Sequence, residues 1–243
     1  SLVFWFFGTL VFWFFGFFEF MTSKNLITAP VNTSLEKAES VLTRARVEKL
    51  LIVDERNRLR GLITMRDIDN IQHHPLACRD ERGRLRAGAA VGVHQYERVE
   101  ALIEAEVDVV IVDTAHGHSK GVFKTVKQLK SKLKVDIIAG NVATSDGTQA
   151  LIDAGVDAVK VGIGAGSSCT TRMIAGVGVP QLSAVMDAFE TANKSDIPII
   201  SDGGMRYSGD IAKSFAAGAE TAMLGSILAG TNESPGEVIL LEG

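Results

Sequence analysis

The strongest constraint on the fold is the alternation of apolar and amphipathic segments in the second half of the chain. Short apolar runs such as VDVVIVDT and VDIIAGNV are separated by stretches with helical periodicity such as KGVFKTVKQLKSKL. Near-continuous apolar strands that alternate with amphipathic helices are typical of a parallel sheet. The six expected strands lie at residues 87–93, 107–114, 135–142, 157–163, 197–204 and 220–226.

Two architectures fit this alternation, a doubly wound sheet and a (β/α)8 TIM barrel. Almost every expected strand ends in Gly, Asp, Asn or Ser, so polar residues collect at one rim, where barrel active sites lie. No GxGxxG motif follows the first expected strand, where a dinucleotide-binding sheet would place it. We therefore expect an α/β fold with an incomplete catalytic barrel over residues 76–243. It would hold strands three to eight of the barrel, and the chain would be a fragment of a longer protein.

Residues 21–75 predict a separate β-α-β-β unit. ITAPVNT reads as a strand and a turn, and Thr33 and Ser34 can cap the helix SLEKAESVLTRARV. KLLIVD and LRGLITM then read as a hairpin joined by ERNR. A unit this small cannot bury both faces of its sheet alone, so it needs a partner.

The segment VEKLLIVDERNRLRGLITMRDI resembles one CBS motif. CBS motifs work in pairs and commonly bind adenine nucleotides. The resemblance implies a partial CBS (Bateman) domain in which Thr64 and Asp67 contact ribose. The alternative, that these two residues only cap the following helix, stays open.

The first twenty residues differ from the rest of the chain. LVFWFFG occurs twice, at 2–8 and 10–16. The uncharged run from Leu2 to Phe18 approaches the roughly 17–25 residues that span a bilayer, but it lacks the basic n-region and the A-x-A-type cleavage site of a signal peptide. A verbatim aromatic repeat is unlike natural membrane helices. We interpret residues 1–20 as an anomalous aromatic head and an artefact, with a membrane or aggregation-prone anchor as the alternative.

Charge and cysteine content exclude several classes of function. The formal net charge is −4 and no basic stripe stands out, so we expect no nucleic-acid partner. Cys78 and Cys169 are the only cysteines, which is no disulfide framework and favours a cytoplasmic protein. Neither cysteine has the spacing of a zinc site.

The glycine-rich run GIGAGSSCTTRMIAGVGVPQ, residues 162–181, is the strongest candidate for a functional loop. Its glycines and Pro180 exclude regular secondary structure, and a connection of about 15 residues without such structure is usually functional. Backbone amides and Arg172 can favour the thiolate of Cys169, which is the nucleophilic form. His116 and His118 raise two alternatives. A cysteine protease would need a peptide groove that a barrel lacks, and a metal site would need further ligands.

A phosphate site is predicted at the ends of the last two strands. Barrels often hold phosphate between the loops after strands seven and eight, on exposed backbone amides. The last two expected strands end in SDGGMR and LGS, and Ser167 can join from the cysteine loop. Asp202 would lie between phosphate and nucleophile, where a carboxylate can bind a ribose diol. The residues expected to hold the phosphate are Gly203, Gly204, Gly225, Ser226 and Ser167.

Several segments resemble the inosine-5′-monophosphate (IMP) dehydrogenase family, over nearly all of residues 21–243. They are GIGAGSSCTTRMIAGVGVPQLSAV, DTAHGHS, AGNVAT, SDGGMRYSGDIAKSFAAGA and MLGSILAGTNESPGE. The resemblance implies a TIM barrel with a CBS domain inserted after its second strand. It also implies a cytoplasmic homotetramer in guanine nucleotide biosynthesis that binds no membrane, with an adenine or guanine nucleotide possible at the CBS unit.

The resemblance also implies roles for individual residues. Cys169 would attack C2 of the hypoxanthine ring, hydride would pass to NAD, and Thr171 would help to activate the water that hydrolyses the adduct. A mobile flap with a general-base arginine is expected after Gly243, so this chain is expected to bind nucleotide without completing turnover. The implied binding residues are Ser167, Asp202, Gly203, Gly204, Gly225 and Ser226 for IMP, Asp113, Asn141, Gly162 and Gly164 for NAD, and the carbonyls of Gly164, Gly166 and Cys169 for potassium.

Two other functions compete with IMP oxidation. Guanosine-5′-monophosphate (GMP) reductase shares the cysteine loop and uses NADPH, but is expected to lack CBS motifs, so residues 26–71 argue against it. A non-catalytic nucleotide-sensing module is the second alternative, and the intact Cys-Thr-Thr-Arg sequence at 169–172 argues against it.

Overall fold

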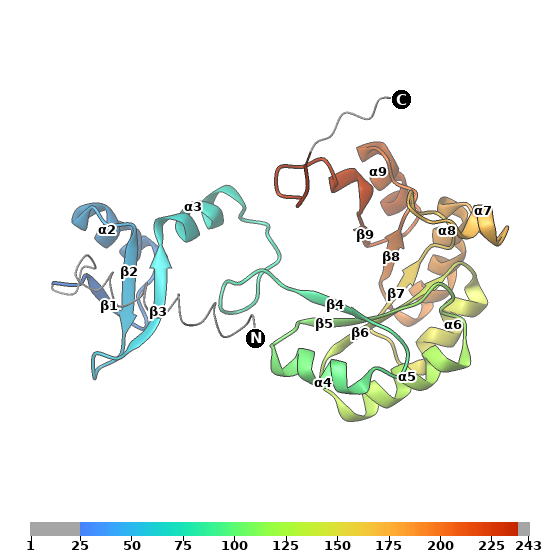
Figure 1. Ribbon diagram of the computed structural model, residues 1–243, viewed down its shortest axis with the longest axis horizontal. Coiled ribbons are helices and arrows are strands. Elements are labelled where there is room, and N and C mark those ends of the chain that lie inside the picture. Colours follow the sequence, from blue (N-terminus) through green and yellow to red (C-terminus); the bar gives the residue numbers. More distant parts are fainter. Residues whose placement is uncertain (1–24, 238–243) are drawn as a thin grey trace, which may run out of the picture. The chain divides into compact units, whose positions relative to one another are not determined.

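The computed structural model describes residues 25–237, which divide into two compact units between Arg82 and Gly83 (Figure 1). Residues 1–20, the aromatic head, lie outside the described range. Within that range, no helix has the length and apolar character needed to cross a membrane.

The first unit is a three-stranded sheet with two helices. β1 (Thr28–Pro30) pairs in parallel with β2 (Lys49–Val53), which pairs antiparallel with β3 (Leu59–Thr64). The helices are α2 (Leu35–Ala45) and α3 (Met65–His73). The predicted β-α-β-β order is confirmed, and its small core consists of Ala29, Ala38, Leu42, Leu50, Ile52 and Ile68.

Local hydrogen bonds explain where both helices of this unit begin. The predicted cap Ser34 accepts the amide of Lys37 at the start of α2. At the start of α3, Thr64 and Asp67 form a capping box, in which Thr64 Oγ1 accepts the Asp67 amide at 3.1 Å and Asp67 Oδ2 accepts the Thr64 amide at 2.9 Å. The capping role that the sequence left open for Thr64 and Asp67 is therefore present.

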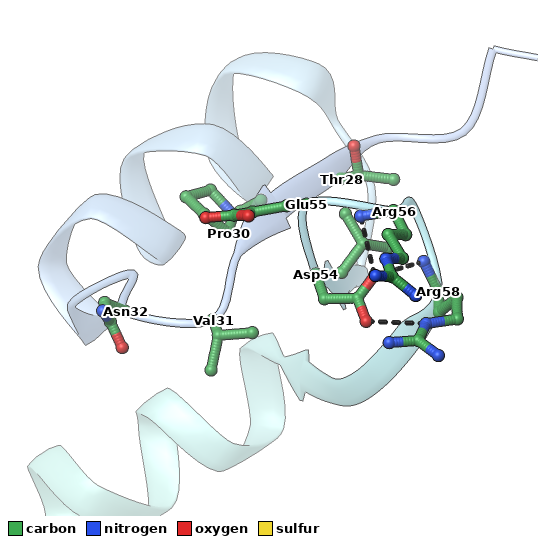
Figure 2. A pocket seen from close by; sticks show the side chains of 10 residues that line it. Thr28, Pro30, Val31, Asn32, Asp54, Glu55, Arg56 and Arg58 are labelled. Atoms are coloured by element: carbon green, nitrogen blue, oxygen red, sulfur yellow. Dashed lines mark hydrogen bonds and ion pairs between the residues drawn. The ribbon is translucent and has the colours of Figure 1, made fainter.

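A pocket of about 760 Å³ lies at the end of the small sheet that is opposite to Thr64 (Figure 2). Thr64 pairs with Lys49 at one end of β2, whereas the pocket is lined at the opposite end by Val53 and the hairpin turn. In that turn Asp54 Oδ1 accepts the amides of Arg56 and Arg58, and Asp54 Oδ2 accepts Arg58 Nε. The Asp54 carboxylate thus bonds three groups of the turn that follows it.

The second unit is built on a curled, all-parallel sheet of six strands in sequence order (Figure 1). Every predicted apolar run contains one strand. The strands are β4 (Gly88–Val91), β5 (Val109–Asp113), β6 (Asp136–Val142), β7 (Ala158–Val161), β8 (Ile199–Asp202) and β9 (Thr221–Met223).

Helices flank the outer side of this curled sheet, as in half of a barrel (Figure 1). Alternate strand residues such as Val110, Ile137 and Val159 are fully buried in one core with helix residues such as Leu129 and Leu151. The intervening strand residues face the inner side, because side chains alternate along a strand. The helices are α4 (Tyr96–Glu104), α5 (Lys120–Lys132), α6 (Ser145–Ala154), α8 (Gln181–Ala192) and α9 (Ser208–Ala216), with 3-10 turns η1 (Asn193–Ser195) and η2 (Ser226–Leu228).

One detail of the cysteine loop differs from the sequence prediction. Residues 162–180 were expected to hold no regular element, yet α7 (Thr171–Ile174) forms a single helical turn within them. The turn begins two residues after Cys169, and the amides of Met173 and Ile174 both bond the carbonyl of Thr170. A helix of four residues makes one turn, which is too short to show a periodic pattern of apolar residues in the sequence.

Candidate functional site

Cys169 lies in the loop between β7 and α8, immediately before α7. Its thiol is exposed and lies 3.3 Å from Thr171 Oγ1, within hydrogen-bond distance. Hydrogen bonds from the Thr171 side chain, then from the Thr171 backbone, lower the pKa of the Cys169 thiol from its ordinary value of 9.0, and Arg172 adds to the effect. The loop therefore favours the nucleophilic thiolate.

The cysteine loop and the ends of the last two strands enclose one cavity of about 580 Å³. It contains Cys169 together with the residues predicted to hold a phosphate. Met205 and Arg206 from the β8 turn and Gln181 from α8 also line it. The predicted site residues in this cavity are Gly164, Gly166, Ser167, Cys169, Asp202, Gly203, Gly204, Gly225 and Ser226.

A second cavity of about 300 Å³ shares three of these residues. It opens beside the ends of β5 and β6 and is lined by every remaining predicted site residue. The shared residues are Gly164, Cys169 and Asp202, and the added ones are Asp113, Asn141, Gly162 and Thr171. Cys169 and Asp202 therefore lie where the two cavities meet.

Two glycines allow this close assembly. Gly162 has a φ of +148°, and a Cβ there would collide with the backbone carbonyl of Asp202. Gly203 has a φ of +91°, and a Cβ there would lie 2.9 Å from the amide nitrogen of Gly166. Residues that carry a side chain rarely adopt such φ values, so both turns need glycine to bring the cysteine loop against β8.

Asp202, at the end of β8, is held by two side chains from β6 and β7. Asn141 on β6 donates from Nδ2 to Asp202 Oδ2 at 2.9 Å and to the Gly162 carbonyl at 2.8 Å. Lys160 on β7 forms an ion pair with the same carboxylate oxygen. The Asp202 side chain is 24% exposed and the Lys160 side chain only 2%, so the acid is the more accessible of the two where both line the 300 Å³ cavity.

The sequence analysis missed two residues of this site. Lys160 stands alone among apolar neighbours in DAVKVGI, and a single charge in an expected buried strand was the available signal. Gln181 donates from Nε2 to the Val161 carbonyl at 2.8 Å and to Ser201 Oγ at 3.1 Å, which joins α8 to β7 and β8. Nothing in its sequence context distinguishes Gln181 from an ordinary first residue of a helix.

The potential for metal binding rests on backbone oxygen atoms. Among residues 25–237, no three His, Cys, Asp or Glu side chains gather as a metal site. The Gly166 carbonyl accepts the Cys169 amide at 3.0 Å, and a carbonyl oxygen has a second lone pair for a cation. The carbonyl oxygens of the cysteine loop are thus compatible with a cation of a single positive charge, which needs no cluster of carboxylates.

Comparison with known proteins then decides the family. A sequence model described as the IMP dehydrogenase / GMP reductase domain matches residues 29–243. The chain belongs to this family. It is 59% identical to an inosine-5′-monophosphate dehydrogenase of Aquifex aeolicus over 93% of this chain and 46% of that protein. It is 56% identical to one of Rhodopirellula baltica over 92% of this chain and 42% of that protein.

The solved structures similar to this family member include GMP reductases. One from Trypanosoma brucei in complex with guanosine 5′-monophosphate has a TM-score of 0.81 and 44% identity, over 90% of this chain and 46% of that one. The chain spans about half the length of the curated relatives it matches.

The structural match corrects one expectation. Residues 83–243 are about two thirds of the chain, so a match over 90% includes the small unit. The expectation that a GMP reductase lacks this unit is therefore wrong, and residues 26–71 do not discriminate between the two activities of the family.

Proposed function

We propose that this chain carries the nucleotide-binding and cysteine-bearing part of an enzyme that oxidises IMP to xanthosine 5′-monophosphate with NAD, in guanine nucleotide biosynthesis. One observation carries the proposal. Cys169 and Asp202 line a single cavity with the glycine turns that follow β8 and β9. A nucleophile, a diol acceptor and exposed backbone amides are the groups that a nucleoside monophosphate requires.

The chemistry assigned to the chain's own residues begins at Cys169. Its thiolate forms a bond to C2 of the purine, whose phosphate lies on the amides of Gly204 and Gly225 and whose ribose hydroxyls bond Asp202. NAD, when bound, accepts the hydride that leaves C2. Water then adds to C2, its proton passes to a base helped by Thr171, and the carbon–sulfur bond breaks to release the product and restore the cysteine.

The cofactor and the cation have separate places in the proposal. Asp113 and Asn141 would hold the nicotinamide side, and both line the 300 Å³ cavity with Cys169. Asp113 is 44% exposed, which leaves its carboxylate accessible to a ribose diol. Gly162 and Gly164 allow close approach there, and the carbonyls of Gly164, Gly166 and Cys169 would hold potassium.

Further parts of the proposal concern the larger protein. The six-stranded half-barrel would be strands three to eight of a (β/α)8 TIM barrel, over residues 76–243. Residues 21–75 would be one motif of a CBS domain that binds an adenine or guanine nucleotide. The family relationship supports both, together with a homotetramer in the cytoplasm.

Two assays distinguish IMP oxidation from GMP reduction, the alternative that the similar solved structures favour. The chain is mixed with IMP and NAD, or with GMP and NADPH, and the reduced cofactor is followed by its absorbance. We expect NADH to form in an amount up to one equivalent of the protein, with IMP-derived mass retained on the protein, and Cys169→Ala to abolish both. NADPH consumption with GMP, and no NADH from IMP, would reverse the assignment. A non-catalytic sensing module would bind nucleotide without either change.

A further inference from the structure

Lys160 is a buried cation between two carboxylates, of which Asp113 is exposed and Asp202 half-buried. Val159 and Val161 beside it on β7 belong to the core under the helices, so Lys160 points to the inner side of the sheet. Its Nζ lies 3.0 Å from Asp113 Oδ1 at the end of β5, and it also pairs with Asp202 Oδ2 at the end of β8. The Lys160 side chain therefore connects the two carboxylates at the ends of β5 and β8.

The register of the sheet explains how Lys160 reaches two strands away. Gly140 on β6 pairs with Asp113 on one side and with Lys160 on the other, so it lies between them. A Cβ at Gly140 would lie 2.8 Å from Lys160 Cβ. Because Gly140 has no side chain, the Lys160 amine can cross β6 and meet Asp113.

The ion pairs fix how each carboxylate is presented. Lys160 and Asn141 both bond Asp202 at Oδ2, and Lys160 bonds Asp113 at Oδ1. Among the described residues, Asp202 Oδ1 and Asp113 Oδ2 accept no hydrogen bond. Both acids line the 300 Å³ cavity with Cys169, and Asp202 also lines the 580 Å³ cavity, so each acid keeps one carboxylate oxygen available for a ligand.

Burial makes this arrangement hard to replace. A buried ammonium group needs charged partners, and removing it leaves two like charges close together without compensation. The two acids would then repel each other and lose the fixed orientation of their free oxygens.

We propose that Lys160 is a positioning residue that ties Asp113 to Asp202 and thereby orients both ribose-binding carboxylates at once. The inference rests on the proposed function and deepens it, since one buried cation sets the geometry of the IMP site and the NAD site together. Lys160 itself contacts the two acids and acts on the nucleotides only through them.

The test measures the dissociation constants of IMP and NAD in a Cys169→Ala background, in which the reaction cannot proceed. We expect Lys160→Met to weaken both ligands by about ten-fold or more, as for the loss of a charge-assisted bond. Lys160→Arg, which keeps the charge, should restore both affinities in large part. Asp202→Asn should weaken mainly IMP, and Asp113→Asn mainly NAD.

A matched control is Lys130→Met, which removes an ion pair with Asp157 at 2.8 Å, formed by two residues that line neither cavity. It should leave both affinities unchanged. If Lys160→Met does not fold, Lys160→Gln is measured in the same way, since it keeps a donor but loses the charge.

Three outcomes would overturn the inference. Unchanged binding of both ligands in the folded Lys160 variant would show that the acids need no cation, and a loss confined to one ligand would break the tie between the sites. Failure of the Cys169→Ala chain with Lys160 intact to bind IMP would overturn the proposed function together with this inference.

Discussion

Asn141 Nδ2 donates to Asp202 Oδ2 at 2.9 Å, although 61 residues separate them in the chain. The same amide also donates to the Gly162 carbonyl at 2.8 Å, at the start of the cysteine loop. Asn141 was predicted to bind the cofactor, and it also lines the cavity beside Asp113. Its side chain therefore fixes the acid and the loop at the point where the two cavities meet.

The first prediction concerns this amide. Asn141→Ala removes both donors from partly buried acceptors, which should lower the free energy of unfolding by about 1–3 kcal/mol and weaken IMP binding. Asn141→Asp should be worse, because it adds a like charge beside Asp202. Chemical denaturation and calorimetric titration with IMP measure the two effects.

Asn193→Ala is the control for this prediction. Asn193 is exposed at the end of α8, and a surface change of this kind should alter stability by no more than about 0.5 kcal/mol. Equal effects at positions 141 and 193 would contradict a special role for the Asn141 amide.

The second prediction concerns the pH dependence of Cys169. The Thr171 hydroxyl favours the thiolate and lowers the pKa of Cys169, so alkylation should rise with pH at a midpoint below the ordinary value of 9.0. Thr171→Val removes the hydroxyl, so the pKa of Cys169 should rise and the rate profile should move to higher pH. Iodoacetamide labelling over a pH series, in a Cys78→Ser background with one thiol, measures the midpoint.

Thr170→Val is the matched change for the second prediction. Thr170 is adjacent in sequence, and its side chain caps no helix. The midpoint should stay in place in this variant. Coincident profiles for Thr171→Val and the unaltered chain would mean that the hydroxyl does not act on the sulfur.

The sequence predicted those parts of the fold that depend on repeating patterns. Runs such as VDVVIVDT become buried strands because an apolar segment flanked by amphipathic helices has few other ways to leave water. The cysteine loop was predictable because glycine and proline exclude regular structure, apart from the short turn after Cys169.

Cross-strand relationships could not be read in the same way. The tie from Lys160 to Asp113 depends on the register of three strands and on the missing side chain of Gly140, neither of which a local pattern encodes. A single lysine in an apolar run indicates an unusual position, but it does not predict which residues the lysine contacts. Gln181 is hidden for the same reason, since its bonds to β7 and β8 exist only once the sheet has formed.

The third prediction tests the close packing at Gly162. Gly162→Ala places a Cβ on a backbone with a φ of +148°, against the Asp202 carbonyl. This strain should lower the free energy of unfolding by about 2 kcal/mol or more and weaken IMP binding. Gly209→Ala in α9 meets nothing within 4 Å, so it should be neutral or add up to about 1 kcal/mol through helix propensity. Thermal unfolding of the two variants gives the comparison, and similar losses in both would argue against strain at Gly162.

The fourth prediction concerns Asp54 in the hairpin of the small unit. The backbone amide of Arg58 is the largest cause that lowers the pKa of the Asp54 carboxyl from its ordinary value of 3.8, and the Arg58 and Arg60 side chains add to it. Because the folded pKa is below the unfolded one, the stabilising contribution is complete above about pH 4 and is lost as the pH falls through the folded pKa. Titration of the Asp54 carboxyl by NMR should give a midpoint below 3.8, and Asp54→Asn should speed amide exchange at Arg56 and Arg58 at neutral pH, since both amides lose a charged acceptor.

Glu55→Gln is the control for the fourth prediction. It changes the charge of the adjacent residue but leaves the Asp54 acceptors in place, so amide exchange at Arg56 and Arg58 should stay slow. Equal exchange in both variants, or a midpoint at or above 3.8, would show that Asp54 does not hold the hairpin.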